Sequence, residues 1–242
     1  MSPQTDVATM AGTNTETKDY PAIYSSIGST YEDAFAQDTG LFDFLKTALH
    51  CRIYPAPPTS STSAAELVGP FASVLSSAEH HVLGMDISET MVELSRKAVP
   101  SGVFEMGDMR NYMPKEVNFD GVFNILSLFI LSREEIEAMA AQWSTWSKPG
   151  DVLCICIMAA EDPRLKSGAG EGYDEDGFCA RDIRVRFMGN RVSVTLFAKE
   201  GWRWLLEENC FEVVVEKEDL YKLPPESDSD DEPHYFLIAR KM

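Results

Sequence analysis

A short apolar run that ends in an acid constrains the fold of this chain more than any other feature. The run covers His81 to Asp86, and the helix-like segment Ser88 to Lys97 follows it directly. An acid at the end of a buried parallel strand can accept hydrogen bonds from two ribose hydroxyls, which is how doubly wound sheets hold nucleoside-containing cofactors. The two segments therefore predict one strand-to-helix unit of a parallel sheet, with Asp86 at its binding edge.

Further strand-like and helix-like segments alternate along the chain. We expect buried strands over residues 103–106, 119–125 and 152–158, and helices over residues 88–98 and 132–146. Alternation of this kind predicts an α/β fold with a doubly wound, mostly parallel sheet. A chain of 242 residues suits one such domain with an insertion.

The two ends of the sequence differ in pattern. Residues 1–19 are polar and rich in Thr, and we expect a disordered tail there, with a single domain over residues 20–242. Apolar residues then recur at three- and four-residue steps between Tyr24 and Leu49. This spacing predicts two short helices, or one helix interrupted at residues 39–40, that serve as a lid or brace.

The final third of the chain changes character. Residues 183–187 and 192–197 alternate like an antiparallel hairpin, within a segment of about residues 165–198 that we interpret as a small insertion on the substrate side. Residues 210–215 and 234–239 predict a second antiparallel pair that closes the edge of the sheet. The acidic stretches 174–176 and 228–232 are expected to be solvated loops.

Composition restricts the class of partner. The chain has 39 acidic and 21 basic residues, for a formal charge of -18, which opposes binding to nucleic acid or to an anionic membrane. A small-molecule substrate is expected instead. Without a long apolar run or a signal-like N-terminus, a cytoplasmic protein is expected, either a monomer or a homodimer.

The five cysteines show no metal-binding or disulfide pattern. None of them has C-x-x-C spacing, so we expect no metal site and no disulfide framework. Cys154 and Cys156 lie two apart in a strand-like run and are expected to pack as small hydrophobic residues.

One region departs from the alternating pattern. Pro55, Pro57 and Pro58 are followed by a Ser/Thr run up to Ser63. Because proline removes backbone donors and fixes φ, we expect only a stub of strand around residues 52–54. Gly69 then precedes a proline that can begin a helix over residues 71–78.

Four pieces together resemble the class I S-adenosylmethionine-dependent methyltransferases, especially their small-molecule branch. The pieces are residues 84–88 (GMDIS), 107–109 (GDM), 119–124 (FDGVFN) and 148–150 (KPG), and the resemblance spans about residues 24–241. It implies a Rossmann-like fold with an antiparallel last strand and S-adenosylmethionine as cofactor. It also implies methyl transfer to a small acceptor from secondary metabolism.

The resemblance assigns roles to individual residues. Asp86 would bind the ribose hydroxyls, with Ile87 and Met91 beside the adenosine. Asp108 would accept the adenine amine while Met109 covers the ring. Two roles that involve no ligand stay open: Asp86 as an exposed loop acid, and Asp108 as a helix or turn cap.

Four more residues are candidates on the same ground. Asn124 would lie between the cofactor methionine and the substrate, where it can orient a ligand but cannot act as a strong base. Tyr24 and Tyr31 would close over the cofactor, or else pack as ordinary aromatic residues. Gly69 is all that remains near the family's Gly-x-Gly-x-Gly loop. No catalytic residue is predicted.

The altered glycine loop leaves three functions open. The leading hypothesis is methyl transfer, an in-line displacement that needs positioning more than acid-base groups. A second is a methyltransferase-like enzyme that has lost transfer and catalyses a cyclisation, rearrangement or isomerisation. A third is a non-catalytic partner of another protein.

Overall fold

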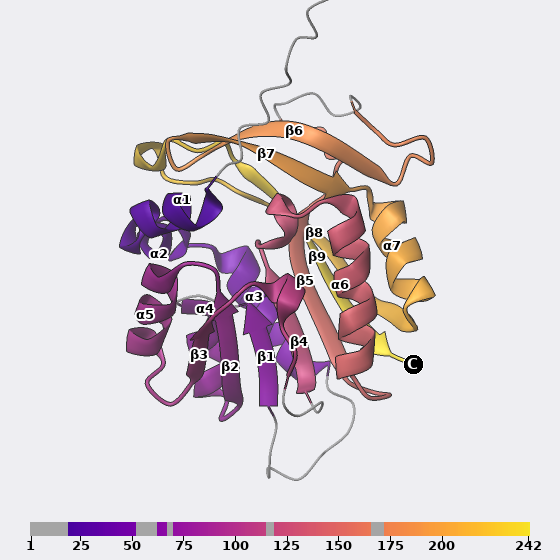
Figure 1. Ribbon diagram of the computed structural model, residues 1–242, viewed down its shortest axis with the longest axis horizontal. Helices are drawn as coiled ribbons and strands as arrows, with labels where there is room; N and C mark the ends of the chain where they lie inside the picture. Colours follow the sequence, from indigo (N-terminus) through magenta and orange to yellow (C-terminus); the bar gives the residue numbers. More distant parts are fainter. Residues whose placement is uncertain (1–18, 52–61, 67–69, 115–118, 166–171) are drawn as a thin grey trace, which may run out of the picture.

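The computed structural model describes residues 19–51, 62–66, 70–114, 119–165 and 172–242 (Figure 1). The predicted tail, the expected strand at residues 52–54 and Gly69 lie outside the described residues, apart from Asp19, whose side chain caps the first helix. Within these residues the strands form one 7-stranded sheet and a separate 2-stranded sheet.

The large sheet has the order β3-β2-β1-β4-β5-β9-β8. Its strands are β1 (Thr62–Glu66), β2 (His81–Asp86), β3 (Val103–Met106), β4 (Phe119–Ile125), β5 (Val152–Met158), β8 (Phe211–Tyr221) and β9 (Glu232–Lys241). Strands β1 to β5 pair in parallel, and β9 lies antiparallel between β5 and β8. The predicted doubly wound sheet with an antiparallel last strand is confirmed.

The central strand β1 is the main error of the sequence prediction. It comprises residues 62–66, which begin inside the Ser/Thr run that we expected to be loop. Its backbone pairs with both neighbours: Ala64 lies opposite Leu83 on β2 and Val122 on β4. A central position in a parallel sheet can hold residues of low strand propensity, because two apolar neighbouring strands supply its backbone partners.

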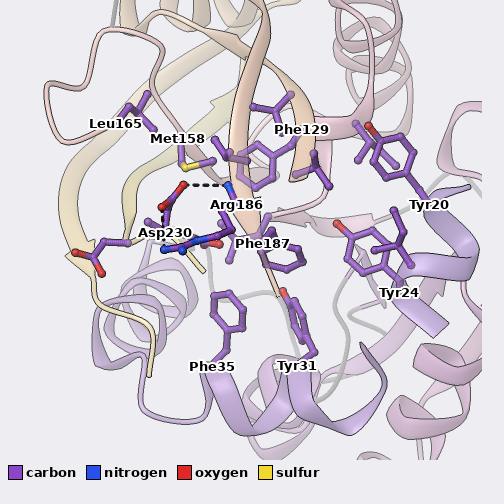
Figure 2. A pocket seen from close by; sticks show the side chains of 18 residues that line it. Tyr20, Tyr24, Tyr31, Phe35, Phe129, Met158, Leu165, Arg186, Phe187 and Asp230 are labelled. Carbon is purple, nitrogen blue, oxygen red and sulfur yellow. Dashed lines mark hydrogen bonds and ion pairs between the residues drawn. The ribbon is translucent and has the colours of Figure 1, made fainter. Parts of the chain in front are cut away.

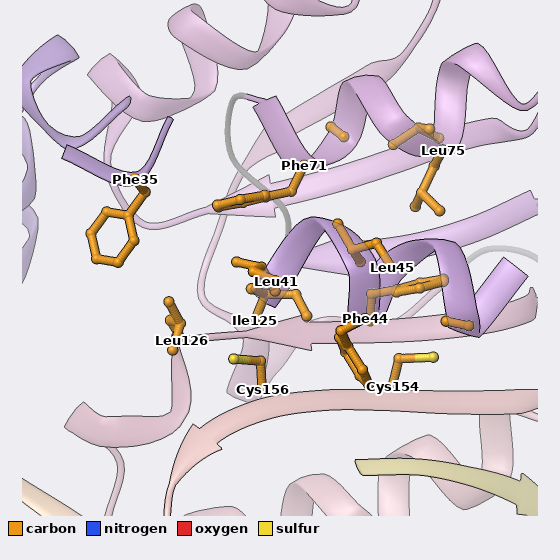
Figure 3. Packing of buried hydrophobic residues seen from close by; sticks show 14 of the residues in the cluster. Phe35, Leu41, Phe44, Leu45, Phe71, Leu75, Ile125, Leu126, Cys154 and Cys156 are labelled. Atoms are coloured by element: carbon orange, nitrogen blue, oxygen red, sulfur yellow. The ribbon is translucent and has the colours of Figure 1, made fainter. Parts of the chain in front are cut away.

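Helices cover both faces of the sheet. They are α1 (Tyr20–Ile27), α2 (Ser29–Phe35), α3 (Thr39–His50), α4 (Pro70–Ser77), α5 (Glu89–Ala98), α6 (Arg133–Trp146) and α7 (Lys199–Glu208), with short 3-10 turns η1 (Met109–Asn111), η2 (Leu128–Ile130) and η3 (Pro225–Ser227). Helices α3, α4 and α5 share one apolar core with the sheet, and α6 and α7 share the other. Figure 3 shows the first core, in which Phe44 and Leu45 of α3 lie over Cys154 of β5. Cys154 and Cys156 are buried free thiols, which confirms their packing role.

The N-terminal segment forms three helices where one or two were expected. The first break is at Gly28, whose φ of 53° and ψ of -133° are strained for residues with a Cβ. The second is at Asp38, whose carboxylate accepts a hydrogen bond from Leu41 N at 2.9 Å and so caps α3. Gly40 lies inside α3, where an added Cβ would be 2.3 Å from Asp219 Oδ2. It therefore serves close packing, not a helix break.

The hairpin of β6 (Cys179–Phe187) and β7 (Asn190–Phe197) lies across one end of the large sheet (Figure 1). It packs on Met158, the last residue of β5, in a small third core. The Tyr20 hydroxyl donates to Ser193 O at 3.1 Å and so ties α1 to β7. The hairpin thereby covers the edge of the sheet at which the parallel strand β5 ends.

The acidic stretch 174–176 is largely exposed, as expected, but two of its three acids also form ion pairs. Arg133, at the start of α6, contacts Asp174 at 2.9 Å and Asp176 at 2.6 Å. Arg181 of β6 contacts Asp174 at 2.8 Å. Residues distant in sequence thus use these acids to hold the hairpin against α6, which the local charge pattern did not reveal. No helix in the described part of the chain has the length and apolarity to cross a membrane.

Candidate functional site

A cavity of about 680 Å³ lies where β2 and β4 end. We call it the strand-end cavity. Its walls include seven of the nine predicted site residues: Tyr24, Tyr31, Asp86, Ile87, Met91, Asp108 and Met109. Because parallel strands end at one edge of a sheet, side chains from separate strand-to-helix turns meet there.

Asp86 is held at the end of β2 by the turn into α5. Its Oδ1 accepts a hydrogen bond from Ser88 N at 2.7 Å, and Ser88 in turn caps α5 through Met91 N. Burial raises the pKa of Asp86 to about 6, although the Ser88 N–H acts in the opposite direction. Among the described residues this is its one hydrogen bond, so Oδ2 is available to a ligand. The half-buried carboxylate is mainly ionised near neutral pH and suits hydroxyl donors.

Asp108 has a partner that the sequence did not suggest. Arg110 Nε contacts both carboxylate oxygens at 2.8 and 2.9 Å, and Arg110 N donates to Oδ1 at 3.0 Å. These bonds lower the pKa of Asp108, so it remains charged. The turn-cap interpretation therefore describes the observed contacts, because Asp108 caps η1. A ligand at Asp108 would have to share the carboxylate with Arg110, which also contacts Glu135 at 2.7 Å.

Three apolar side chains line the same cavity. Met91 is 1% exposed and Met109 is 7% exposed, while Ile87 is partly buried. Their thioethers and methyl groups offer a flexible apolar surface of the kind that packs on a flat ring. The cavity thus combines apolar walls with the two carboxylates.

Asn124 does not line the strand-end cavity. It is 1% exposed in β4, and its Oδ1 accepts a hydrogen bond from Ser127 at 2.9 Å. Phe123 and Ile125 face the core beneath α3 to α5, so the alternation of the strand turns Asn124 toward Met139 of α6. Its expected position between cofactor and substrate stays a prediction, and Asn124 contributes to a different cavity beside α6. Asn124 instead anchors the loop that carries Ser127, which does line the cavity.

A second cavity, of about 750 Å³, lies between α1, α2, η2 and the β6–β7 hairpin. We call it the hairpin cavity; Figure 2 shows its lining. It shares four lining residues with the strand-end cavity: Tyr24, Tyr31, Leu126 and Ile130. The two cavities are therefore neighbours separated by one wall.

The hairpin cavity is mostly aromatic and aliphatic, with a group of charged side chains at one side. Phe129 and Phe187 are among its walls, as Figure 2 shows. Arg186 N donates to Asp230 Oδ2 at 2.9 Å, which binds residues 228–232 to β6. Glu232, also in the lining, is only 7% exposed. The expectation that this acidic stretch is solvated holds for the exposed Asp228 but is wrong for the buried Glu232. Asp230 lies between these extremes and takes its partner from a hairpin more than forty residues earlier.

Tyr24 and Tyr31 pack as aromatic residues, and their closure over a cofactor stays a prediction. They pack against Phe187, with ring centroids 6.2 and 6.4 Å away, and they also line both cavities. Burial raises the pKa of both phenols, so they keep their protons at neutral pH. They serve as an uncharged wall, not as a base.

Comparisons with known proteins agree with this geometry. Residues 67–150 match a family model described as "Methyltransferase domain". A protein of known structure from Pyrococcus horikoshii OT3 has a TM-score of 0.64 at 20% identity, covering 91% of this chain and 99% of that one. These likenesses show that the chain has the Rossmann-like fold of the class I methyltransferases.

Two further structures with a similar fold belong to enzymes of stated activity. Magnesium protoporphyrin IX methyltransferase from Synechocystis PCC 6803, with bound SAH, has a TM-score of 0.62 at 15% identity, covering 93% of this chain and 100% of that one. The 1,6-didemethyltoxoflavin-N1-methyltransferase of Burkholderia thailandensis has a TM-score of 0.61 at 12% identity, covering 92% and 87%. No curated protein matches the chain in sequence.

Proposed function

We propose that this protein transfers a methyl group from S-adenosylmethionine to a small-molecule acceptor. The observation that carries the proposal is the common wall of Tyr24, Tyr31, Leu126 and Ile130 between two neighbouring cavities. One cavity would hold the cofactor and the other the acceptor. S-adenosylmethionine supplies the methyl group as an electrophile bound to a sulfonium, and the protein contributes alignment and exclusion of water.

The strand-end cavity fits the nucleoside part of that cofactor. Asp86 Oδ2 is available for ribose hydroxyls, and Met91 and Met109 supply apolar surface for a base. The ion pair of Asp108 with Arg110 adds a fixed polar edge. A related methyltransferase structure with bound SAM, from Synechocystis PCC 6803, has the same fold at a TM-score of 0.60.

The hairpin cavity would select the acceptor. Its aromatic walls favour a flat, mainly apolar molecule, as expected for secondary metabolism. The net charge of -18 supports a small acceptor over nucleic acid. We also propose that the protein acts in the cytoplasm, as a monomer or homodimer.

Calorimetry with S-adenosylmethionine and S-adenosylhomocysteine tests the proposal directly. We expect micromolar binding of both by the wild-type protein, and Asp86→Ala to weaken it by more than about tenfold, because a charged acceptor of hydroxyl hydrogen bonds is lost. Glu89→Ala is the matched control: Glu89 is exposed and begins α5 outside the cavity. Absence of binding at millimolar ligand would remove methyl transfer and favour a methyltransferase-like fold with another role.

A further inference from the structure

Three ionisable side chains from separate segments meet beside the hairpin cavity. Glu232 and His234 lie two residues apart on β9 and so share a face of the strand. Glu232 Oε2 is 3.0 Å from His234 Nε2, and Asp38 Oδ2 is 3.3 Å from His234 Nδ1. The imidazole therefore bridges two carboxylates, one from each side.

These three side chains, which we call the row, follow the order Asp38, His234, Glu232. The row is open to a ligand at its Glu232 end. The side chain of His234 is 0% exposed and that of Asp38 is 2% exposed, whereas Glu232 belongs to the lining of the hairpin cavity. Tyr221 stacks on the imidazole at a centroid distance of 6.0 Å, and Phe236 meets it edge-on. The packing fixes the ring plane and keeps water from it.

The inner end of the row is held by its own members. Asp38 Oδ1 is bound to Leu41 N, while Asp38 Oδ2 and His234 Nδ1 have no standard hydrogen-bond partner among the described residues. These two atoms lie 3.3 Å apart, so each provides a polar partner for the other. The described residues contain no group of side chains that could hold a metal ion. Pairing of two buried polar atoms explains the arrangement better than a metal site does.

The charges around the row favour a proton on it. Burial raises the pKa of Asp38, while the charge of His234 and the Leu41 N–H act to lower it, and Glu232 and Asp219 raise it again. Asp219 comes from β8, where it pairs with His234. Other ionisable groups that face the row are the phenols of Tyr24, Tyr31 and Tyr221 and the thiol of Cys156. A proton held on this row reduces the repulsion between its two carboxylates.

We propose that Glu232 is the catalytic base that takes the proton of the acceptor, with His234 and Asp38 as positioning residues that stabilise the proton taken up. The inference rests on the proposed methyl transfer. For an alcohol, the O–H proton goes to the Glu232 carboxylate as the oxygen bonds the methyl carbon. For an amine, the nitrogen lone pair bonds the methyl carbon, and the N–H proton of the resulting ammonium goes to Glu232. In both cases the carbon–sulfur electron pair returns to the cofactor sulfur. The His–carboxylate arrangement orients and stabilises the protonated base, as in other buried acid-base relays.

The row also indicates the class of acceptor. A neutral aromatic alcohol needs a base to become a good nucleophile, an aromatic amine needs one to take the proton released on methylation, and either would fit beside Phe129 and Phe187. A carboxylate acceptor is already ionised at neutral pH and would meet, among the described residues of the lining, three acids, Asp230, Asp231 and Glu232, against the one cation Arg186. We therefore assign the hairpin cavity to aromatic acceptors with an O–H or N–H group.

Naphthol, naphthylamine and naphthoic acid, which share one ring system, are suitable probes. With S-adenosylmethionine, release of S-adenosylhomocysteine is expected with naphthol or naphthylamine and not with naphthoic acid. Methylation of the acid alone, or of none of the three, would overturn the assigned acceptor class. Calorimetry on the same sample separates the hypotheses: loss of cofactor binding refutes methyl transfer itself, whereas normal cofactor binding confines the failure to this inference.

Glu232→Gln keeps the shape of the side chain and removes the base. We expect kcat with naphthol or naphthylamine, whichever the wild-type protein methylates, to fall at least about 100-fold, with KM changed less than about threefold. Affinity for S-adenosylhomocysteine should be unchanged. Glu226→Gln, which removes an equal charge from an exposed position on η3, is the control. A kcat for Glu232→Gln equal to that of the control would overturn the role of Glu232.

The Asp38→Asn variant distinguishes the positioning role of Asp38 toward His234 from its structural role as the cap of α3. Asparagine can still cap α3 through Leu41 N, but it removes the charge that faces His234. We expect an unchanged melting temperature, a kcat about tenfold lower and an altered pH profile of kcat. Asp38→Ala should also lower the melting temperature. A wild-type pH profile and kcat in Asp38→Asn would exclude the positioning role.

A measurement without turnover completes the test. The chain has four histidines, so nitrogen NMR of the labelled free protein can resolve their ring signals. Glu232→Gln should move both ring-nitrogen signals of His234, assigned with a His234→Asn variant, and leave those of the other histidines in place. Unmoved His234 signals would show that Glu232 and the imidazole are not coupled.

Discussion

The strand-end cavity and the hairpin cavity are neighbours, yet they are built in different ways. The first takes its chemistry from short segments, in which Asp86 is the last residue of β2 and Asp108 lies two residues after the end of β3. The second joins residues that are far apart in the chain, such as Tyr20 of α1, which bonds Ser193 of β7 across 173 positions. A site made from local turns persists as a sequence pattern, whereas a site made by packing distant elements has no such pattern.

The comparison predicts that each cavity can be damaged without the other, and the largest effect should come from filling the hairpin cavity. Val185 of β6 lines it and is half-buried, so Val185→Trp can enter the space without disrupting a tight core. We expect kcat/KM for whichever naphthalene probe the wild-type protein methylates to fall at least about 100-fold, because the acceptor is displaced from alignment. Calorimetry should find the affinity for S-adenosylhomocysteine within about twofold of wild type.

Arg184→Trp is the matched control for this prediction. Arg184 precedes Val185 on the same strand, is exposed and points to the other face of the hairpin. It should retain near-wild-type turnover. Equal losses in the two variants, or a loss of cofactor affinity in Val185→Trp, would show that the cavities are not separable.

The next effect should be a pH dependence confined to the strand-end cavity. Burial raises the pKa of Asp86 to about 6, so its ionised fraction falls about tenfold between about pH 7 and pH 5. Because the ionised form accepts hydroxyl hydrogen bonds, affinity for S-adenosylhomocysteine should fall by a similar factor. Asp108 does not titrate in this range, since its pKa is lowered by Arg110.

Asp86→Asn provides the comparison for that measurement. The variant should bind weakly with little pH dependence, as followed by calorimetry across the same range. The raised pKa also means that folded Asp86 binds a proton more readily than the unfolded chain does. Wild-type stability should therefore fall as pH rises from about 4 to about 6, and Asp86→Asn should abolish that part of the slope. An equal slope in both proteins would contradict the assignment.

The smallest effect should come from the wall that both cavities share. Gly28 separates α1 from α2 at a φ of 53°, and an added Cβ would find no atom closer than 3.8 Å. Gly28→Ala should therefore cost only backbone strain, about 1 kcal/mol in chemical denaturation. The substitution should also shift Tyr24 slightly relative to Tyr31. The affinities for cofactor and for acceptor should therefore both fall, each by less than about threefold. Ser29→Ala, at the exposed start of α2, is the control.

The division between local turns and packed distant segments also decides which features could be predicted from the sequence. Asp86, Met91, Asp108 and Met109 could be placed at one site because parallel strands end at a common edge. Asn124 could not, because one step along the pleat decides which face a side chain takes. Strand β1 was missed because its Ser/Thr-rich start carries little strand signal, and its neighbours β2 and β4 hold it in place.

By itself, the sequence determined the doubly wound sheet, its antiparallel last strand and the acid at the end of β2, since each depends on a local alternation of apolar and polar residues. Only the tertiary structure decided the hairpin cavity and the row of Asp38, His234 and Glu232. The acidic stretch 228–232 appeared solvated in the sequence, whereas in the structure Asp230 accepts a hydrogen bond from β6 and Glu232 is buried beside His234. Contacts between distant segments are set by how the layers pack, and no local pattern records them.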